Sequence, residues 1–166
     1  MAEMRRAKWV AGLMLVLAVL PLAAQRRGFG GFGMRGNMPP PAASPYDGKF
    51  AIVRLWYGGH PGWSFDYPDM EQHLNLILPE LTAIEPSPAG GNVLRMDDPE
   101  LLKFPIAYLS EPGYWFPNDR EVEGLRTYIE KGGFLIVDDF HFPNEWAVFE
   151  MAMLRVLPRA RIQRLE

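Results

Sequence analysis

Short apolar runs alternate with helix-like repeats along the chain from residue 50 onward. Residues 50–57, 93–96, 105–110 and 134–137 are runs of β-branched, aromatic and other apolar residues, and each predicts a strand. Between these runs, apolar residues recur at the spacing of a helix that buries one face. Strands that alternate with helices favour right-handed crossovers and a parallel sheet that is covered on both faces. The pattern therefore predicts an α/β fold.

Three longer helices are predicted between and after the strands. The first has an apolar stripe that we expect to face the sheet, and Pro79 should kink it near its end. The second begins at Asn118, which forms a capping-box pattern with Glu121, and ends at Gly132-Gly133. Asn144 is expected to cap the third helix, which Pro158 stops. The stripe of the first helix consists of Met70, Leu74, Ile77, Leu78 and Leu81.

A fifth strand is expected at residues 161–165, directly before the last residue, Glu166. These elements together predict a flavodoxin-like three-layer sandwich with a mostly parallel sheet. Such a sandwich needs at least one more helix after the fifth strand. We therefore expect the sheet to be incomplete at the C-terminus and the chain to be truncated there.

The first 24 residues have the pattern of a secretory signal peptide. Three basic residues precede an apolar run from Trp9 to Leu20, and small residues follow it. This run is short for a bilayer, which takes about 20 apolar residues to cross. We predict cleavage near Ala24 and a periplasmic or secreted protein, with an uncleaved inner-membrane anchor as the alternative. Contact with a membrane is expected only through this segment.

Residues 25–48 are rich in glycine, proline and arginine and predict a flexible linker. Residues 49–166 then form the α/β domain. The chain has no cysteine, which excludes a disulfide framework, a thiolate metal site and a cysteine nucleophile. Removal of residues 1–24 takes three of the 17 basic and one of the 20 acidic residues and leaves a formal charge of −5. This acidic balance argues against nucleic acid as a partner.

Polar and aromatic residues gather just after the predicted strands. Because parallel strands present their carboxyl ends at one edge of the sheet, these residues should converge on a single ligand site. Trp63 and Trp115 are expected to be its exposed rings, since aromatic faces suit sugars and peptide side chains. The candidates are His60, Trp63 and Asp66 after the first strand, Glu111 and Trp115 after the third, and Asp138, Asp139 and His141 after the fourth.

Arg54 lies in the middle of the first strand, where a doubly covered sheet has no solvent face for it. We expect a buried ion pair with Asp66, Glu111 or Asp139, and binding of an anionic ligand is the alternative. Asp138 and Asp139 point to opposite sides of an extended strand, so they are not expected to act as a close acid and base pair.

Imidazoles and carboxylates at one edge are also compatible with a divalent metal ion, held by His60, Asp139 and His141. Their spacing matches no compact metal motif. Neither Gly58-Gly59 nor Gly90-Gly91 has the spacing of a phosphate-binding loop, and no G-x-S-x-G elbow occurs. No cofactor is therefore predicted.

Residues 50–55, the loop from Trp63 to Tyr67 and above all the run from Gly132 to Asp139 carry a resemblance to a known family. The chain resembles the bacterial domain of unknown function 4159, which is similar to the class I glutamine amidotransferase-like superfamily. The resemblance implies a flavodoxin-like sandwich, supplies no catalytic residues, and covers residues 49–166 of a domain that usually continues further. Amidotransferases place a cysteine after this strand, whereas this chain has Asp138 and Asp139, so amidotransferase chemistry is excluded.

These observations favour an exported, non-catalytic domain that binds an unknown small molecule, a carbohydrate or an envelope protein at the strand ends. Trp63, Trp115, Asp139 and His141 are expected to line the site. The alternative is a hydrolase in which His60, Asp139 and His141 hold a metal ion that activates water. A structural role in an envelope assembly is the third hypothesis.

Overall fold

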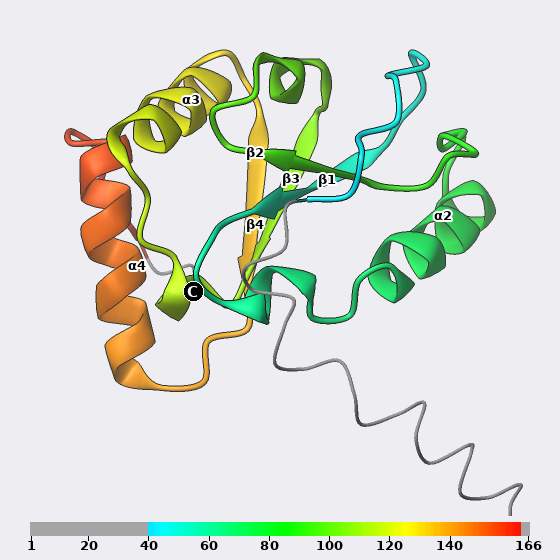
Figure 1. Cartoon of the computed structure of the whole chain (residues 1–166). Helices are drawn as coiled ribbons and strands as arrows, with labels where there is room; N and C mark the ends of the chain where they lie inside the picture. The colour runs from blue at the N-terminus through cyan, green and yellow to red at the C-terminus, as the bar shows by residue number, and fades with distance from the viewer. Residues whose placement is uncertain (1–39, 164–166) are drawn as a thin grey trace, which may run out of the picture. The chain divides into compact units, whose positions relative to one another are not determined.

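Four parallel strands form the centre of the computed structural model, which describes residues 40–163 (Figure 1). They are β1 (Ile52–Trp56), β2 (Asn92–Arg95), β3 (Ile106–Ser110) and β4 (Phe134–Asp138). Their order in the sheet is β2-β1-β3-β4, and every pairing is parallel. The predicted α/β, flavodoxin-like fold class is confirmed.

The longer helices cover the two faces of the sheet unequally. They are α2 (Asp69–Leu81), α3 (Asp119–Glu130) and α4 (Pro143–Val156), and three short 3-10 helices, η2 (Pro61–Ser64), η3 (Pro99–Lys103) and η4 (Pro112–Tyr114), lie in the loops. Figure 1 shows α3 and α4 on one side of the sheet and α2 on the other. Val53, Leu55 and Leu109 belong to the hydrophobic core. Arg54, between two of these residues, points the other way and meets Glu71 of α2.

Helix α3 begins where the capping-box pattern predicts. The Asn118 Oδ1 atom accepts hydrogen bonds from the backbone N–H groups of Arg120 at 2.9 Å and Glu121 at 3.1 Å. Glu121 Oε2 accepts from the Asn118 N–H at 3.0 Å. The helix buries Val122 and Leu125 and ends before Gly132, whose φ of +96° lies in the left-handed region that glycine tolerates. Both predicted ends of this helix are confirmed.

Helix α2 forms as predicted, with Pro79 inside it, but its apolar stripe does not face the sheet. Glu71 is its buried residue, whereas Ile77 is exposed and Leu81 is 78% exposed. The helix is held to β1 through the Glu71 carboxylate and Arg54, so a polar contact stands where an apolar contact is expected. The expected orientation of the stripe is therefore wrong.

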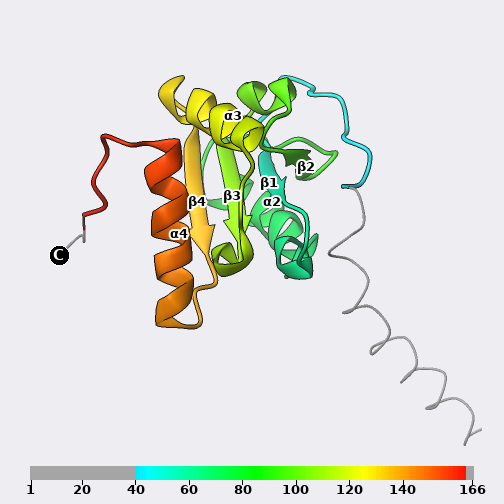
Figure 2. The same cartoon turned by 60° about the vertical axis from the view of Figure 1, so that its left-hand side comes forward.

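Helix α4 starts one residue earlier than Asn144, at Pro143, and its cap differs from the prediction. Glu145 Oε2 accepts from the backbone N–H groups of His141 at 2.6 Å and Phe142 at 3.2 Å. Figure 2 shows α4 alongside β4. Residues 161–163 form no strand, and residues 164–166 lie outside the described part. Among residues 40–163, β4 therefore pairs with β3 alone, and the expected fifth strand is absent from this range.

Part of the predicted linker contacts the domain. Ser44 donates its backbone N–H to Asn92 Oδ1 at 3.2 Å, and the Tyr46 ring packs edge-on against Phe104 at 5.2 Å. The predicted signal peptide and residues 25–39 lie outside the described residues. Within residues 40–163, no helix has the length and apolar character needed to cross a membrane.

Candidate functional site

The strand order places a topological switch between β1 and β3. The chain leaves β1 toward β2 on one side, and it leaves β3 toward β4 on the other, so the loops after β1 and β3 part at this point. Tyr57 Oη donates to the backbone oxygens of Ser110 and Glu111, each at 2.9 Å. The ring of His60 stacks on that of Tyr114, with centroids 3.6 Å apart. The two loops are thus joined where open α/β sheets bind ligands.

An imidazole and a carboxylate join the loop after β3 to the loop after β4. His141 Nε2 lies 2.8 Å from Glu111 Oε1, and with a proton on Nε2 the imidazole donates to that carboxylate. The side chain of Glu111 is 7% exposed, whereas that of His141 is 55% exposed. The carboxylate is therefore a buried anchor, and the imidazole is half exposed to solvent.

The hydrogen bond from Glu111 and its negative charge raise the pKa of His141 above its usual value. Burial acts weakly in the opposite direction, and Glu145 and Asp139 add to the increase. All three carboxylates favour the imidazolium, so the site holds a proton on His141 to a higher pH than a free histidine would.

Three non-glycine residues of the described chain have positive φ, and all three lie in loops at this edge. The φ angles are 55° for Asp66, 52° for Glu111 and 67° for Asp139. A left-handed conformation at a non-glycine residue costs about 1–3 kcal/mol, and such residues cluster at functional sites. Here the conformation turns each chain sharply at or beyond a strand end and places the carboxylates on the edge.

The two aspartates at the end of β4 have different partners. Asp139 Oδ2 accepts from the Ser110 hydroxyl at 2.9 Å, and Asp138 Oδ2 lies 3.4 Å from the Tyr108 hydroxyl. Burial and the charges of Asp138 and Asp139 raise the pKa of Tyr108 to about 12. The two carboxylates thus have separate partners, and the strand ends at Asp138, before the left-handed Asp139.

Close approach of the loops depends on two glycines. A β-carbon at Gly62 would lie 2.6 Å from Glu111 Cβ and 2.8 Å from Tyr57 Oη. At Gly113, a β-carbon would collide with the side chain of Glu145. Glu145 is a site residue that the sequence analysis does not single out, because it predicts Asn144 as the cap. It accepts from the N–H of Phe142, three residues earlier, but Phe142 has no hydroxyl to complete a capping box, so the sequence pattern does not mark this cap.

Trp63 and Trp115 are not the exposed rings that the sequence predicts. They are 5% and 0% exposed and belong to the hydrophobic core. A large ring in a loop gains more from burial than from solvent exposure, and both rings fill the space beneath the loops. The exposed rings of the loops after β3 and β4 and of the start of α4 are instead Tyr114, Phe116, Phe142 and Trp146.

Arg54 does form a buried ion pair, but none of the three expected partners is correct. Its Nε atom lies 2.7 Å from Glu71 Oε1, and the two side chains are 0% and 2% exposed. Arg54 also donates to the backbone oxygens of Trp63 and Phe65 and stacks over the ring of Tyr108 at 4.8 Å. This arginine binds the loop after β1 to the sheet, and it is not at the solvent-facing edge.

His60, Asp139 and His141 do not form a metal site. The Nδ1 atom of His60 accepts from the Gly62 N–H at 3.0 Å, and its ring is stacked on Tyr114. Over residues 40–163, no group of three His, Asp or Glu side chains is arranged to hold a metal ion. The geometry therefore offers no support for the metal-dependent alternative.

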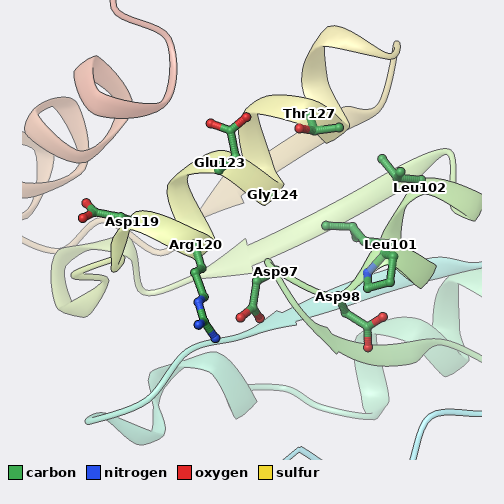
Figure 3. Close-up of a pocket in the computed structure, with 10 residues that line it drawn as sticks. Asp97, Asp98, Leu101, Leu102, Asp119, Arg120, Glu123, Gly124 and Thr127 are labelled. Carbon is green, nitrogen blue, oxygen red and sulfur yellow. The ribbon is translucent and has the colours of Figure 1, made fainter.

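A groove of about 590 Å³ lies between η3 and α3, apart from the predicted site residues (Figure 3). Its floor includes Leu101 and Gly124, and Asp97, Asp98 and Arg120 lie along it. A β-carbon on Gly124 would collide with the carbonyl oxygen of Met96, so α3 rests directly on the backbone after β2. None of the eight predicted site residues lines this groove.

The fold and this edge define a doubly wound α/β domain whose polar loops meet at a topological switch point. The chain belongs to the family described as a domain of unknown function (DUF4159), whose model matches residues 50–166. Comparison with curated proteins and with solved structures finds no match.

Proposed function

We propose that this domain binds a carbohydrate at the carboxyl edge of its sheet and does not catalyse its conversion. The observation that carries the proposal is the Glu111–His141 contact of 2.8 Å, which lies beside the switch point and presents a half-exposed imidazole. A hydroxyl group can donate to a carboxylate and accept from an imidazolium, so a polyol matches both partners of this pair.

Exposed rings stand close to this pair. Tyr114 belongs to the loop after Glu111, and Phe142 follows His141 directly; both are exposed. The loops spanning residues 57–68, 111–118 and 138–146 contain no lysine or arginine. His141 is already paired with the Glu111 carboxylate, so an anionic ligand would meet unbalanced carboxylates at this edge. The neutral face of a sugar, in contrast, packs on an aromatic ring.

The proposal also includes export of the protein and a distant relationship to the class I glutamine amidotransferase-like superfamily. The charged start, the apolar run and the small residues of positions 1–24 support a periplasmic or secreted location. The parallel strand order supports a relationship to the glutamine amidotransferase-like superfamily, without its cysteine.

Saturation-transfer NMR with soluble chitin, cellulose and peptidoglycan oligosaccharides tests this proposal. We expect at least one of these glycans to receive magnetisation from the protein and to emerge chemically unchanged after long incubation. His141→Ala and Phe142→Ala should each weaken binding by about tenfold, since either change removes about 1–2 kcal/mol of binding free energy.

Phe134→Ala is the matched control, because Phe134 and Phe142 are each 63% exposed but lie at opposite ends of β4 and its following loop. Binding should survive this change. Glycans that bind equally well to all three variants, or that bind to none of the proteins, would contradict the proposal.

A further inference from the structure

Among residues 40–163, no helix covers one half of the sheet on the α2 side. Leu135 and Val137 of β4 pack against the core, so the alternate residues Phe134 and Ile136 point to the opposite face. Ile106 and Tyr108 do the same on β3, and Tyr108 contacts Arg54 on the α2 side. We call these four residues, Ile106, Tyr108, Phe134 and Ile136, the open face; none of them is buried.

The exposed flank of α2 borders this open face. On one flank of the helix, Asn75 donates to the carbonyl of Ser87, which lies in the segment leading to β2, at 3.3 Å. Leu74, Ile77 and Leu81 follow the opposite flank, away from β2. Since β2 and β3 lie on opposite sides of β1, this apolar flank is directed toward the open face.

Parallel sheets of this kind are covered on both faces, because each square ångström of apolar surface left in water forgoes about 25 cal/mol. On the other face, α3 and α4 supply that cover. The open face and the α2 flank together form an apolar surface. We expect another layer of protein to cover it, as α3 and α4 cover the opposite face.

The outer side of α4 is a second exposed apolar surface of the same chain, and it could pack against the open face of another copy. Met151 and Leu154 are exposed on the outer side of α4, and the exposed Arg159 and Arg161 follow them. Helix α2, in contrast, exposes Asp69 and Glu80 and contains no lysine or arginine, while its Glu71 is buried against Arg54. The α4 surface is apolar at Met151 and Leu154, with Glu150 beside them, and ends in two arginines. The α2 surface is apolar and carries the exposed Glu80 at the end of its helix.

We propose that a second copy of this chain covers the open face with the outer side of its α4. Within one molecule, α4 lies on the opposite side of the sheet from α2, so the two surfaces cannot meet (Figure 1). Contact between different surfaces of two copies makes a head-to-tail interface. Arg159 and Arg161 of one copy face Glu80 of the next, and Met151 and Leu154 pack over Phe134 and the α2 flank.

Sedimentation velocity of the full chain over a wide range of concentration tests this proposal. We expect the average mass to rise with protein concentration and to fall when salt is added, because salt screens the charge contacts. Phe134→Asp should weaken association by about tenfold or more, since it would bury an unpaired carboxylate. Leu154→Asp on the other surface should have the same effect.

Reversing the charges of the proposed contact tests whether this interface, and not another one, causes association. The double variant Arg159→Glu, Arg161→Glu should weaken association, and Glu80→Arg in the same chain should restore it. Arg120→Glu, an exposed arginine of the η3–α3 groove, is the matched control and should leave association unchanged. A chain that stays monomeric at every concentration, or association that survives both Phe134→Asp and the charge reversal, would overturn the proposal.

Discussion

At the scale of single residues, two contacts between opposite charges hold the loops of the carboxyl edge in different ways. Arg54 and Glu71 are fully buried and tie the loop after β1 to the sheet through the arginine's bonds to backbone oxygens. Glu111 and His141 join the two following loops, with one partner buried and the other half in solvent. The first contact is structural, and the second is available to a ligand.

Replacement of Glu111 by glutamine should lower the pKa of His141. The carboxylate raises that pKa through a hydrogen bond and its charge, and an amide supplies no charge. NMR titration of the imidazole in both proteins measures the change. The signal of His73, which lies on α2, should not differ between them.

The same contact makes stability depend on pH with a definite sign. Because folding raises the pKa of His141, the stabilisation is complete below the unfolded value of about 6.5 and disappears as pH rises through the higher folded value. Thermal unfolding should show this loss in the parent and not in Glu111→Gln. An identical pH profile in the two proteins would exclude the contact as its source.

Arg54→Met should destabilise the domain by about 3–5 kcal/mol, because it leaves the buried Glu71 carboxylate without its partner. Adding Glu71→Leu removes that unpaired charge and should recover much of the loss. Urea unfolding measures both. The exposed Lys103–Glu100 pair is the control, and its removal should change stability by less than about 1 kcal/mol.

At the scale of elements, helix α3 packs closely on the backbone that follows β2 because Gly124 has no side chain at the contact. Gly124 lies against the backbone of Met96 and Asp97, and a β-carbon there would approach the Asp97 Cα atom to 2.9 Å. Backbone cannot move aside as a flexible side chain can. The contact sets how closely α3 approaches the strand ends, and with it the position of the capped N-terminus at Asn118.

Gly124→Ala should therefore destabilise the protein, although the same change in an exposed helix stabilises it by about 1 kcal/mol. Denaturant unfolding measures the sign. Arg120→Ala, one turn earlier in α3 and exposed, should change stability by no more than about 0.5 kcal/mol. An increase in stability on Gly124→Ala would show that α3 shifts freely.

At the scale of the whole molecule, the three layers differ in strand pairing and in how many residues their helices bury. The central strands β1 and β3 are paired on both sides, β4 is paired with β3 alone within the described residues, and α2 buries a single residue. Helix α3, by comparison, buries four residues. The cohesion of the domain lies in β1, β3 and the helices on the α3 side.

Hydrogen exchange should follow this order. We expect the amides of α2 to exchange much faster than those of α3, and those of β1 and β3 to exchange slowest, since local opening exposes little apolar surface where few residues are buried. Mass spectrometry of peptides covering each element measures the rates. Equal protection of α2 and α3 at low protein concentration would contradict this account.

Local patterns in the sequence were enough to predict the four strands and the three longer helices, but not the absence of a strand at residues 161–163. The capping box at Asn118 and the glycine pair after α3 depend only on neighbours in the chain, and both are confirmed. The burial of Trp63 and Trp115 and the choice of Glu71 as partner of Arg54 depend on which segments pack together. Spacing alone cannot decide which carboxylate of the chain pairs with one buried arginine.

By itself, the sequence determined the α/β class, the parallel direction of the strands and the gathering of acidic and imidazole groups after them, because these follow from periodicity and chain direction. The tertiary structure alone decided which imidazole meets which carboxylate, which rings are buried and which face of the sheet residues 40–163 leave uncovered. Such choices depend on distances between segments tens of residues apart, and those distances are set by packing of the whole domain.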